Sequence, residues 1–257
     1  MQKRHLDKDL YFQEQCITTT KYMIPYIQDV VPVNRETVVL EVGCGEGGNL
    51  LPFCRMGCRC VGIDLARTRI DYGKSKLPFD NVTLICKDIH DVDPGDLPAF
   101  DLIFSRDVLE HLHEQERFAG FIKKFLKPTG VIFFAFPPWY MPFGGHQQGI
   151  KHRLLSRLPF YHVLPTPLYV MMLRAGGVPE DYIAALLEIK QTGISIRRFK
   201  KIINARGYHV LKETYWLVNP NYETKFHLTP RKLRALCRIP GLREFLTTCY
   251  YCIVRPG

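Results

Sequence analysis

The chain has 257 residues, of which 46% are hydrophobic and 23% are charged. This composition is typical of a globular protein with a sizeable core, and the length allows one large domain or one domain with an insertion. The net charge is +10, and it arises from the second half, because residues 151–257 carry 18 Lys and Arg against six Asp and Glu. The asymmetry predicts either an anionic partner (a phosphorylated substrate, a membrane surface or RNA) or a solvated basic face.

Nine cysteines include a group of three at Cys54, Cys58 and Cys60. Their odd number, without a signal peptide, argues against a secreted disulfide framework. No Cys or His pair follows at the spacing of a zinc site, so we expect reduced thiols, no metal and a cytoplasmic protein. The most apolar stretch near the middle, residues 163–173, is too short to span a bilayer.

The first half of the chain alternates between helix-like segments and apolar runs. A helical pattern covers residues 6–30. The expected strands are residues 37–42, 60–64, 82–87, 100–105 and 131–136, and the expected helices begin at residue 49 and cover residues 65–76 and 108–126. Continuous apolar strands that alternate with helices predict a doubly wound α/β sheet that is mostly parallel.

Residues 137–193 break this alternation, because they are rich in Pro, Gly and aromatic residues, and they predict an inserted cap with short helices at 167–173 and 180–190. A basic helix at 195–205, a strand at 209–218, a basic stretch at 230–242 and a last strand at 245–254 follow. The last two strands predict an antiparallel pair at the edge of a seven-stranded sheet. The expected organisation is one domain with an insertion: a helical segment 1–34, a ligand-binding half 35–136, the cap 137–193, and the completion of the sheet 194–257.

The first strand runs into a glycine-rich turn, residues 43–48 (GCGEGG). Glycines permit positive φ angles and let a ligand approach the backbone closely. The turn satisfies G-x-G-x-x-G and, together with Glu41, equally satisfies [DE]-x-G-x-G-x-G. Because ligands of open α/β sheets bind beyond the carboxyl ends of the strands, we expect the site at this turn.

Acidic residues also stand at the tips of the next two strands. Asp64, 19 positions after Gly45, can accept hydrogen bonds from both hydroxyls of a ribose. Asp88 can accept one from an adenine amino group. Either residue alone would also serve as a helix N-cap. Both at one edge of the sheet, after a glycine turn, favour a nucleoside-containing ligand.

Four segments in order resemble the motifs of the Rossmann-like, class I S-adenosylmethionine-dependent methyltransferases: 39–50 (VLEVGCGEGGNL), 62–66 (GIDLA), 86–91 (CKDIHD) and 101–112 (DLIFSRDVLEHL). Residues 125–136 (FLKPTGVIFFAF) resemble the family's turn and fifth strand, with Thr129-Gly130 where two glycines are usual. The resemblance implies S-adenosyl-L-methionine as cofactor and S-adenosyl-L-homocysteine as product.

The resemblance also implies the cofactor-binding residues. Those for the methionine part are Glu41, Gly43, Cys44, Gly45, Gly47 and Ser105, and those for the ribose and adenine are Asp64, Leu65, Asp88 and Ile89. The glycine turn by itself also fits a nicotinamide-dependent oxidoreductase. Glu41, Asp88 and the C-terminal strand pair favour the methyltransferase instead.

Methyl transfer is an in-line displacement, so such an enzyme mainly aligns the nucleophile and excludes water. An oxygen or nitrogen nucleophile can need a base, and the candidates are His146, in the loop after the fifth strand, and His111 and Asp107, after the fourth. Each has a plainer interpretation as a loop or helix-surface residue. The candidate substrate contacts are Trp139, Tyr140 and Phe143, which could equally pack the cap onto the sheet.

Three functions fit these observations. The aromatic and aliphatic cap favours a small-molecule, sugar-linked or lipid-like acceptor, with nearby basic residues meeting a phosphate or a membrane face. The basic runs 197–201 and 231–234 would suit an RNA substrate, although no RNA-binding module is recognisable. The third candidate function is that of a cofactor-binding regulator without transferase activity. The sequence does not indicate the oligomeric state.

Overall fold

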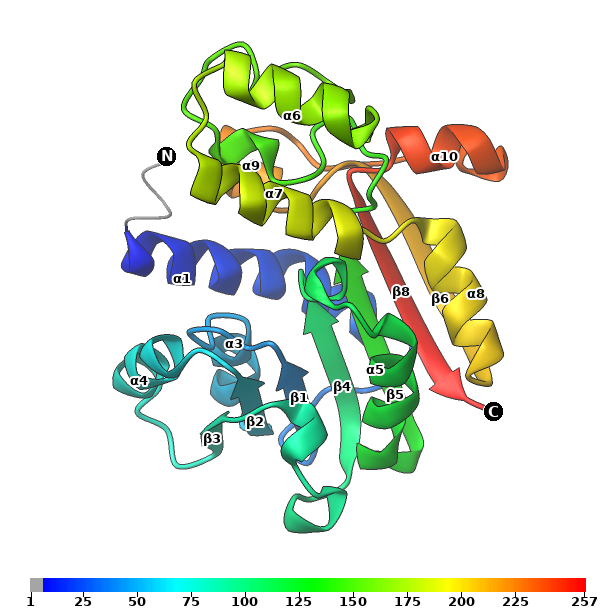
Figure 1. Cartoon of the computed structure of the whole chain (residues 1–257). Coiled ribbons are helices and arrows are strands. Elements are labelled where there is room, and N and C mark those ends of the chain that lie inside the picture. The colour runs from blue at the N-terminus through cyan, green and yellow to red at the C-terminus, as the bar shows by residue number, and fades with distance from the viewer. Residues whose placement is uncertain (1–6) are drawn as a thin grey trace.

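The computed structural model describes residues 7–257, which form an eight-stranded sheet with helices on both faces (Figure 1). The sheet has the order β3-β2-β1-β4-β5-β8-β6-β7. Its first five strands are parallel to one another, whereas β8 runs antiparallel to β5 and to β6. The strands are β1 (Val38–Val42), β2 (Arg59–Asp64), β3 (Val82–Cys86), β4 (Phe100–Arg106), β5 (Leu126–Phe136), β6 (Tyr208–Val218), β7 (Arg231–Lys232) and β8 (Cys249–Pro256).

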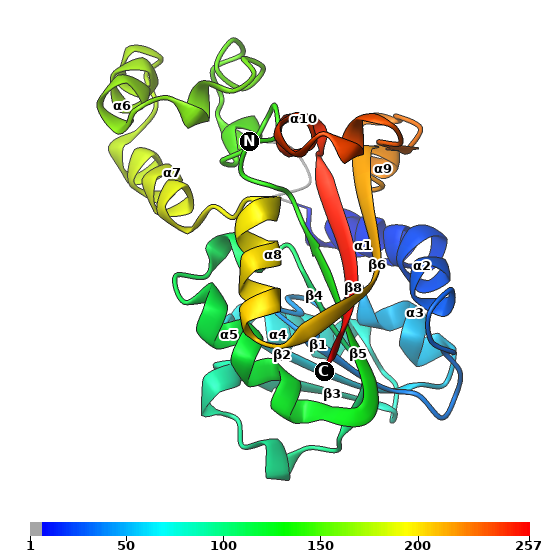
Figure 2. The same ribbon diagram turned by 90° about the vertical axis from the view of Figure 1, so that its right-hand side faces the viewer.

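Both faces of the sheet are covered, which explains why its central strands are apolar without alternation. In the register of β1 against β4, Leu40 pairs with Ile103, and both side chains are fully buried. The helices α5 and α8 cover one face, and α1, α2 and α3 cover the other (Figure 2). Ile70 of α4 packs into the same core as α1, α2 and α3. The helices are α1 (Lys8–Thr18), α2 (Ile24–Gln28), α3 (Leu50–Arg55), α4 (Arg67–Lys76), α5 (Gln115–Ile122), α6 (Thr166–Ala175), α7 (Glu180–Thr192), α8 (Ile196–Ala205), α9 (Tyr222–Phe226) and α10 (Pro240–Leu246).

The cap predicted at residues 137–193 contains α6 and α7 and lies beyond the carboxyl ends of β4 and β5 (Figure 1). It has a small apolar core of its own, centred on Tyr169, Leu173 and Leu186, separate from the two cores that flank the sheet. The sheet therefore carries the cap as an attached unit above the edge where a ligand is expected.

The α/β fold, the parallel sheet and the antiparallel C-terminal strands are as the sequence predicts, but the sheet has eight strands rather than seven. The additional strand, β7, has two residues, which pair with Trp216 and Val218 of β6. A strand this short, within a basic stretch, has no periodicity by which the sequence could reveal it.

Other element boundaries also differ from the sequence prediction. The strand expected at 131–136 begins at Leu126, so the turn expected at Thr129-Gly130 is part of β5. The helix expected at 108–126 is broken into a 3₁₀ turn, Leu109–His111, then α5, and then a second 3₁₀ turn, Lys123–Phe125. The strand expected at 245–254 begins only at Cys249, because Pro240 starts α10 and this helix continues through Leu246. Among residues 7–257, no helix is long and apolar enough to cross a bilayer.

Candidate active site

The glycine turn after β1 has the strained geometry that its sequence predicts. Gly43, Gly45 and Gly47 all have positive φ angles, of 77°, 53° and 76°. A Cβ atom on Gly43 would lie 2.3 Å from Cγ2 of Val108, in the segment after β4. The turn is therefore pressed against the neighbouring strand end, and only glycine fits there.

Asp64, at the tip of β2, is tied to this turn. Its Oδ2 accepts a hydrogen bond from the backbone N–H of Gly45 (2.8 Å), and its Oδ1 accepts one from Ala66 (2.9 Å). The Arg69 guanidinium lies over Gly45 and forms a two-hydrogen-bond ion pair with Glu46 (2.9 and 2.8 Å). A carboxylate and a guanidinium thus border the same turn.

Glu41 lies beneath the turn and is fully buried. Its Oε1 accepts a hydrogen bond from Asn49 Nδ2 (2.7 Å), whereas its Oε2 has no hydrogen-bond partner. Burial raises the pKa of the Glu41 carboxyl well above its usual value, because the low-polarity surroundings penalise the charged form, although the Asn49 hydrogen bond and the Arg106 charge act against this. Arg106, at the end of β4, is also buried and donates to Asn49 Oδ1 (3.0 Å).

The other cofactor candidates lie along the same strand ends. Leu65 follows Asp64 and is 71% exposed, although it is a large apolar residue beside a polar edge. Asp88 caps a 3₁₀ turn, since its Oδ1 accepts from the His90 N–H (2.9 Å), and Ile89 is buried behind it. The structure buries Ser105 within β4, where its Oγ has no hydrogen-bond partner.

Cys44, the remaining cofactor candidate, is buried within the turn. A Cβ atom on Gly62 of β2 would lie 2.8 Å from the Cys44 sulfur. The Cys44 thiol therefore packs against β2. A ligand at this segment would meet the backbone of the turn rather than the Cys44 side chain.

A cavity of about 420 Å³ lies beyond the carboxyl ends of β4 and β5, beneath the cap. It is lined from α1, α4, the segment after β4, the cap and the segment after β6. The lining residues include Tyr11, Arg69, Asp107, Glu110, His111, Trp139, Phe143, His146, Tyr182, Asn221 and Tyr222. Arg69 is shared between this cavity and the glycine turn, so the two parts of the site adjoin.

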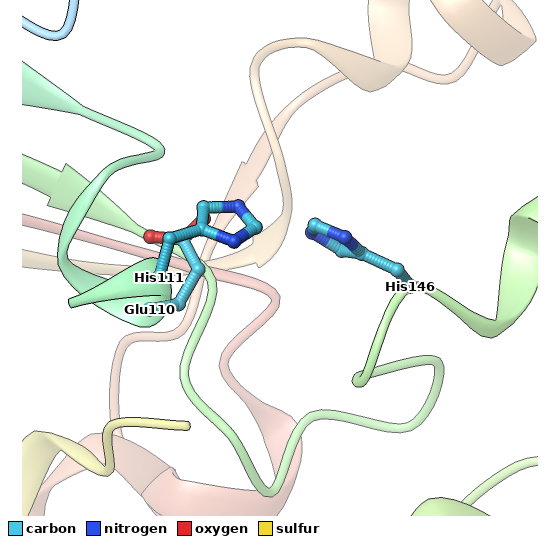
Figure 3. A group of neighbouring side chains, drawn as sticks. All are labelled: Glu110, His111 and His146. Atoms are coloured by element: carbon cyan, nitrogen blue, oxygen red, sulfur yellow. The ribbon is translucent and has the colours of Figure 1, made fainter. Parts of the chain in front are cut away.

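The three base candidates come together in this cavity. Asp107 follows β4 and has a positive φ of 55°, and His146, in the cap loop, has the same value. The imidazole rings of His111 and His146 face one another, with their centroids 4.9 Å apart (Figure 3). Surrounding protein atoms lower the pKa of His111, because they penalise the imidazolium, while the Asp107 charge opposes this.

The turn that carries Glu110 and His111 is held by the end of α7. Thr192 Oγ1 donates to the backbone carbonyl of Glu110 (2.6 Å), and Gln115 Nε2 donates to the carbonyls of Leu109 (2.9 Å) and Thr192. These bonds explain why the expected helix breaks here, since they take over backbone groups that a continuous helix would use. They also fix His111 relative to the cap.

The three aromatic candidates differ in position. Trp139 and Phe143 line the cavity, whereas Tyr140 is outside the lining and packs against Phe245 of α10, with ring centroids 5.5 Å apart. Trp139 also contacts the ring of buried His162, whose Nε2 lies 2.8 Å from the Trp139 carbonyl. Burial lowers the pKa of His162 to about 4, so this imidazole is neutral and structural.

Several site residues were missed by the sequence analysis: Asn49, Arg69, Arg106, Glu110, Tyr182 and Tyr222. Arg106 lies within the motif at 101–112 and Arg69 follows the one at 62–66, so an electrostatic argument about a buried acid could have indicated both. Tyr182 and Tyr222 reach the cavity from segments that are distant in the sequence, so no short-range pattern could predict their position.

The strand order, the glycine turn at the end of β1 and the antiparallel β8 beside β5 together define the Rossmann-like fold of class I methyltransferases. A family model described as a methyltransferase domain matches residues 40–134. This segment, which is under half of the chain, is thus similar to a methyltransferase domain.

Among curated proteins, the chain is similar to the ubiquinone biosynthesis O-methyltransferase of Rhodopseudomonas palustris (strain BisB5), at 33% identity over 101 residues. The match covers 38% of this chain and 38% of that protein, so the chain matches well under half of the relative's length.

Two solved structures share the fold over most of the chain. Geranyl diphosphate C-methyltransferase from Streptomyces coelicolor, in complex with Mg²⁺, geranyl diphosphate and S-adenosyl-L-homocysteine, has a TM-score of 0.56 at 13% identity, covering 91% of this chain and 80% of that one. PKMT2 from Rickettsia typhi has a TM-score of 0.59 at 20% identity, covering 93% of this chain and 53% of that one. At these identities the likeness concerns the fold.

Proposed function

We propose that the protein transfers a methyl group from S-adenosylmethionine to a small-molecule or lipid-like acceptor that binds beneath the cap. The observation that carries this proposal is the cavity of about 420 Å³, which adjoins the glycine turn at Arg69 and is lined in part by the cap. This volume lies in the range of small-molecule sites, and the position is the one at which α/β sheets bind ligands.

The residues at the turn fit the cofactor. The positive φ angles at Gly43, Gly45 and Gly47 leave the backbone open to a close ligand, and the Asp64 carboxylate at the next strand tip suits a ribose diol. The 71% exposed side chain of Leu65 suits the flat face of an adenine. Asp88 and Ile89 would border the same base, and Glu41 and Arg106 would hold the underside of the turn.

The cofactor supplies a methyl group already activated by a positive sulfur, so the protein's contribution is alignment and the movement of one proton. For a hydroxyl acceptor, the oxygen forms a bond to the methyl carbon as the carbon–sulfur bond breaks, and the hydroxyl proton passes to a base. His146, His111 and Asp107 all line the cavity and are the proposed acceptors of that proton.

The acceptor is proposed to be an aromatic or polyprenyl-like molecule with a hydroxyl group. Trp139, Phe143, Tyr182 and Tyr222 give the cavity aromatic walls, and the similar ubiquinone biosynthesis enzyme is named an O-methyltransferase. A few of the basic residues of the second half form ion pairs within the fold: Lys200 pairs with Glu213, Arg206 with Glu116 and Lys212 with Asp29.

The proposal is tested by incubating the protein with methyl-labelled S-adenosylmethionine and a cell extract, and by counting label in the lipid, small-molecule, RNA and protein fractions. We expect label in the lipid or small-molecule fraction, lost on heat inactivation. Label confined to RNA would contradict the acceptor class. Cofactor binding without label in any fraction would favour a cofactor-binding regulator that has no transferase activity.

A further inference from the structure

A cluster of three potential metal ligands lies within the cavity. The sequence alone gave no reason to group these residues. Glu110, His111 and His146 each offer one ligand atom, and these atoms lie within 4.8 Å of one another. Figure 3 shows the two imidazole rings directed at each other from opposite walls, with the Glu110 side chain beside His111. The wall that carries Glu110 and His111 is the 3₁₀ turn after β4, and the other is the cap loop.

Glu110 gives an independent indication that a ligand belongs here. The residue is only 5% exposed, and its Oε2 has no hydrogen-bond partner. An unsatisfied buried carboxylate oxygen is costly, and natural proteins compensate such an atom with a cation or a donor. Asp107 acts on Glu110 as a like charge, so it does not compensate this oxygen.

The backbone is also strained at both walls. Asp107 and His146 are two of four non-glycine residues with positive φ in residues 7–257, and both line this cavity. Such conformations are energetically unfavourable and collect at functional sites. Thr192 and Gln115 hold the Glu110 turn in place, so one wall is rigid and the other is a loop.

From these contacts we propose that Glu110, His111 and His146 bind a divalent first-row transition-metal ion, such as Zn²⁺, Mn²⁺, Fe²⁺ or Co²⁺. Two imidazoles and one carboxylate form a ligand set that such ions accept, with further positions open. With metal–ligand bonds of about 2 Å, the ligand atoms of one ion stand no more than about 4 Å apart. The separation of up to 4.8 Å therefore needs only a small inward shift, which the loop that carries His146 can supply.

Such a site has two consequences. The open coordination positions face the cavity, where they can take an oxygen of a bound molecule. The ion would also link the cap loop to the turn after β4, so that its binding closes the cavity. Ring nitrogens that hold the ion are not available as bases, so the cation site and the imidazole base are competing roles for the same two residues.

The test is a titration of the chelator-treated, full-length protein with Co²⁺, without S-adenosylmethionine, followed by calorimetry and by the visible spectrum. We expect one Co²⁺ per chain with ligand-field bands of nitrogen and oxygen ligands. His146→Ala, His111→Ala and Glu110→Gln should each raise the Kd at least tenfold. Because the test contains no cofactor, its outcome is separate from that of the proposed methyl transfer.

His113→Ala is the matched control, because His113 is exposed, lies two residues after His111 and only approaches Glu188 (3.8 Å). It should bind Co²⁺ like the unaltered protein. Three results would overturn the proposal: no binding, undiminished binding by His146→Ala, or an intense near-ultraviolet cobalt–thiolate band. The last would place the ion on cysteine thiolates instead. His146 is in an exposed loop, so its variant remains informative even if Glu110→Gln does not fold.

Discussion

The two sides of the candidate site are built in different ways. The glycine-turn side lies within residues 41–69, and its shape is set by backbone angles and by hydrogen bonds from Asp64 to Gly45 and Ala66. The cap side gathers Asp107, His111, Tyr182 and Tyr222 from separate segments, through long-range packing. Short-range sequence therefore defines the side proposed to hold the cofactor, whereas the tertiary fold defines the side proposed to meet the acceptor.

This comparison predicts that damage to the turn abolishes cofactor binding, whereas damage to the cap side leaves binding intact and affects turnover. The largest effect is expected from Gly43→Ala. The new Cβ atom would lie 2.3 Å from Val108, at a φ of 77° that alanine rarely adopts. We expect a destabilisation of about 2–4 kcal/mol and a loss of S-adenosylmethionine affinity of at least about a hundredfold, measured by urea unfolding and calorimetry.

Gly177→Ala is the control for backbone strain alone. Gly177 has a φ of 67°, but a Cβ atom there would meet nothing within 4 Å, and it lies in the cap. Gly177→Ala should lower the free energy of unfolding by about 1–2 kcal/mol, without loss of cofactor affinity. Equal effects of the two variants on affinity would show that the close contact at Gly43 does not matter.

His146→Ala tests the other side. Without its imidazole, turnover should fall by about 10²–10⁴-fold, whether that ring takes a proton or holds a cation, while cofactor affinity should change less than about twofold. Steady-state kinetics and calorimetry on the same preparation check this. A variant with full turnover would remove His146 from the chemistry.

Asp64→Ala should have an intermediate effect on the turn side. It removes the proposed ribose contact and two backbone hydrogen bonds, so the affinity for S-adenosylmethionine should fall by about 1–3 kcal/mol in calorimetry, roughly tenfold to a hundredfold. Asp88→Ala loses one local cap bond and should weaken binding less. Unchanged affinity in Asp64→Ala would contradict the assignment of this residue.

Glu41→Gln should have the smallest effect, and on stability. Because burial raises the pKa of Glu41, the folded protein binds this proton more tightly than the unfolded chain does. The group thus favours folding below the unfolded value of 4.5, and this stability is lost as the pH rises through the folded pKa. The glutamine side chain does not ionise, so Glu41→Gln avoids this loss of stability. Its free energy of unfolding should exceed that of the parent by about 1 kcal/mol near neutral pH, and by progressively less toward pH 4.5. Urea unfolding across this range checks it, and a variant less stable than the parent at neutral pH would contradict it.

The fold was largely predictable from the sequence because its strands are continuous buried runs. Four of the five parallel strands were expected to within one residue at each end, whereas β5 begins at Leu126, well before the expected start at residue 131. The antiparallel arrangement at the C-terminus was also expected. The two-residue β7 carries no pattern of its own. The broken helix after β4 depends on Thr192 and Gln115, and Thr192 lies 82 residues from the carbonyl that it binds. Local periodicity cannot contain such information.

The candidate site divides in the same way. The sequence predicted the strand-tip acids and the glycine turn, because these use local backbone chemistry. It named His111 and His146 separately but gave no reason to bring them together with Glu110. It also grouped Tyr140 with Trp139 and Phe143, although Tyr140 packs on α10 outside the cavity. These positions follow from how the cap folds over the sheet.

The central claim is that the glycine turn holds S-adenosylmethionine beside a separate acceptor cavity. Its most direct test is a calorimetric titration of the full-length protein with S-adenosylmethionine, repeated with His146→Ala and Gly43→Ala. The account predicts one equivalent bound by the parent and by His146→Ala, displaced by S-adenosylhomocysteine, and binding lost in Gly43→Ala. A folded parent protein that binds neither compound would contradict it.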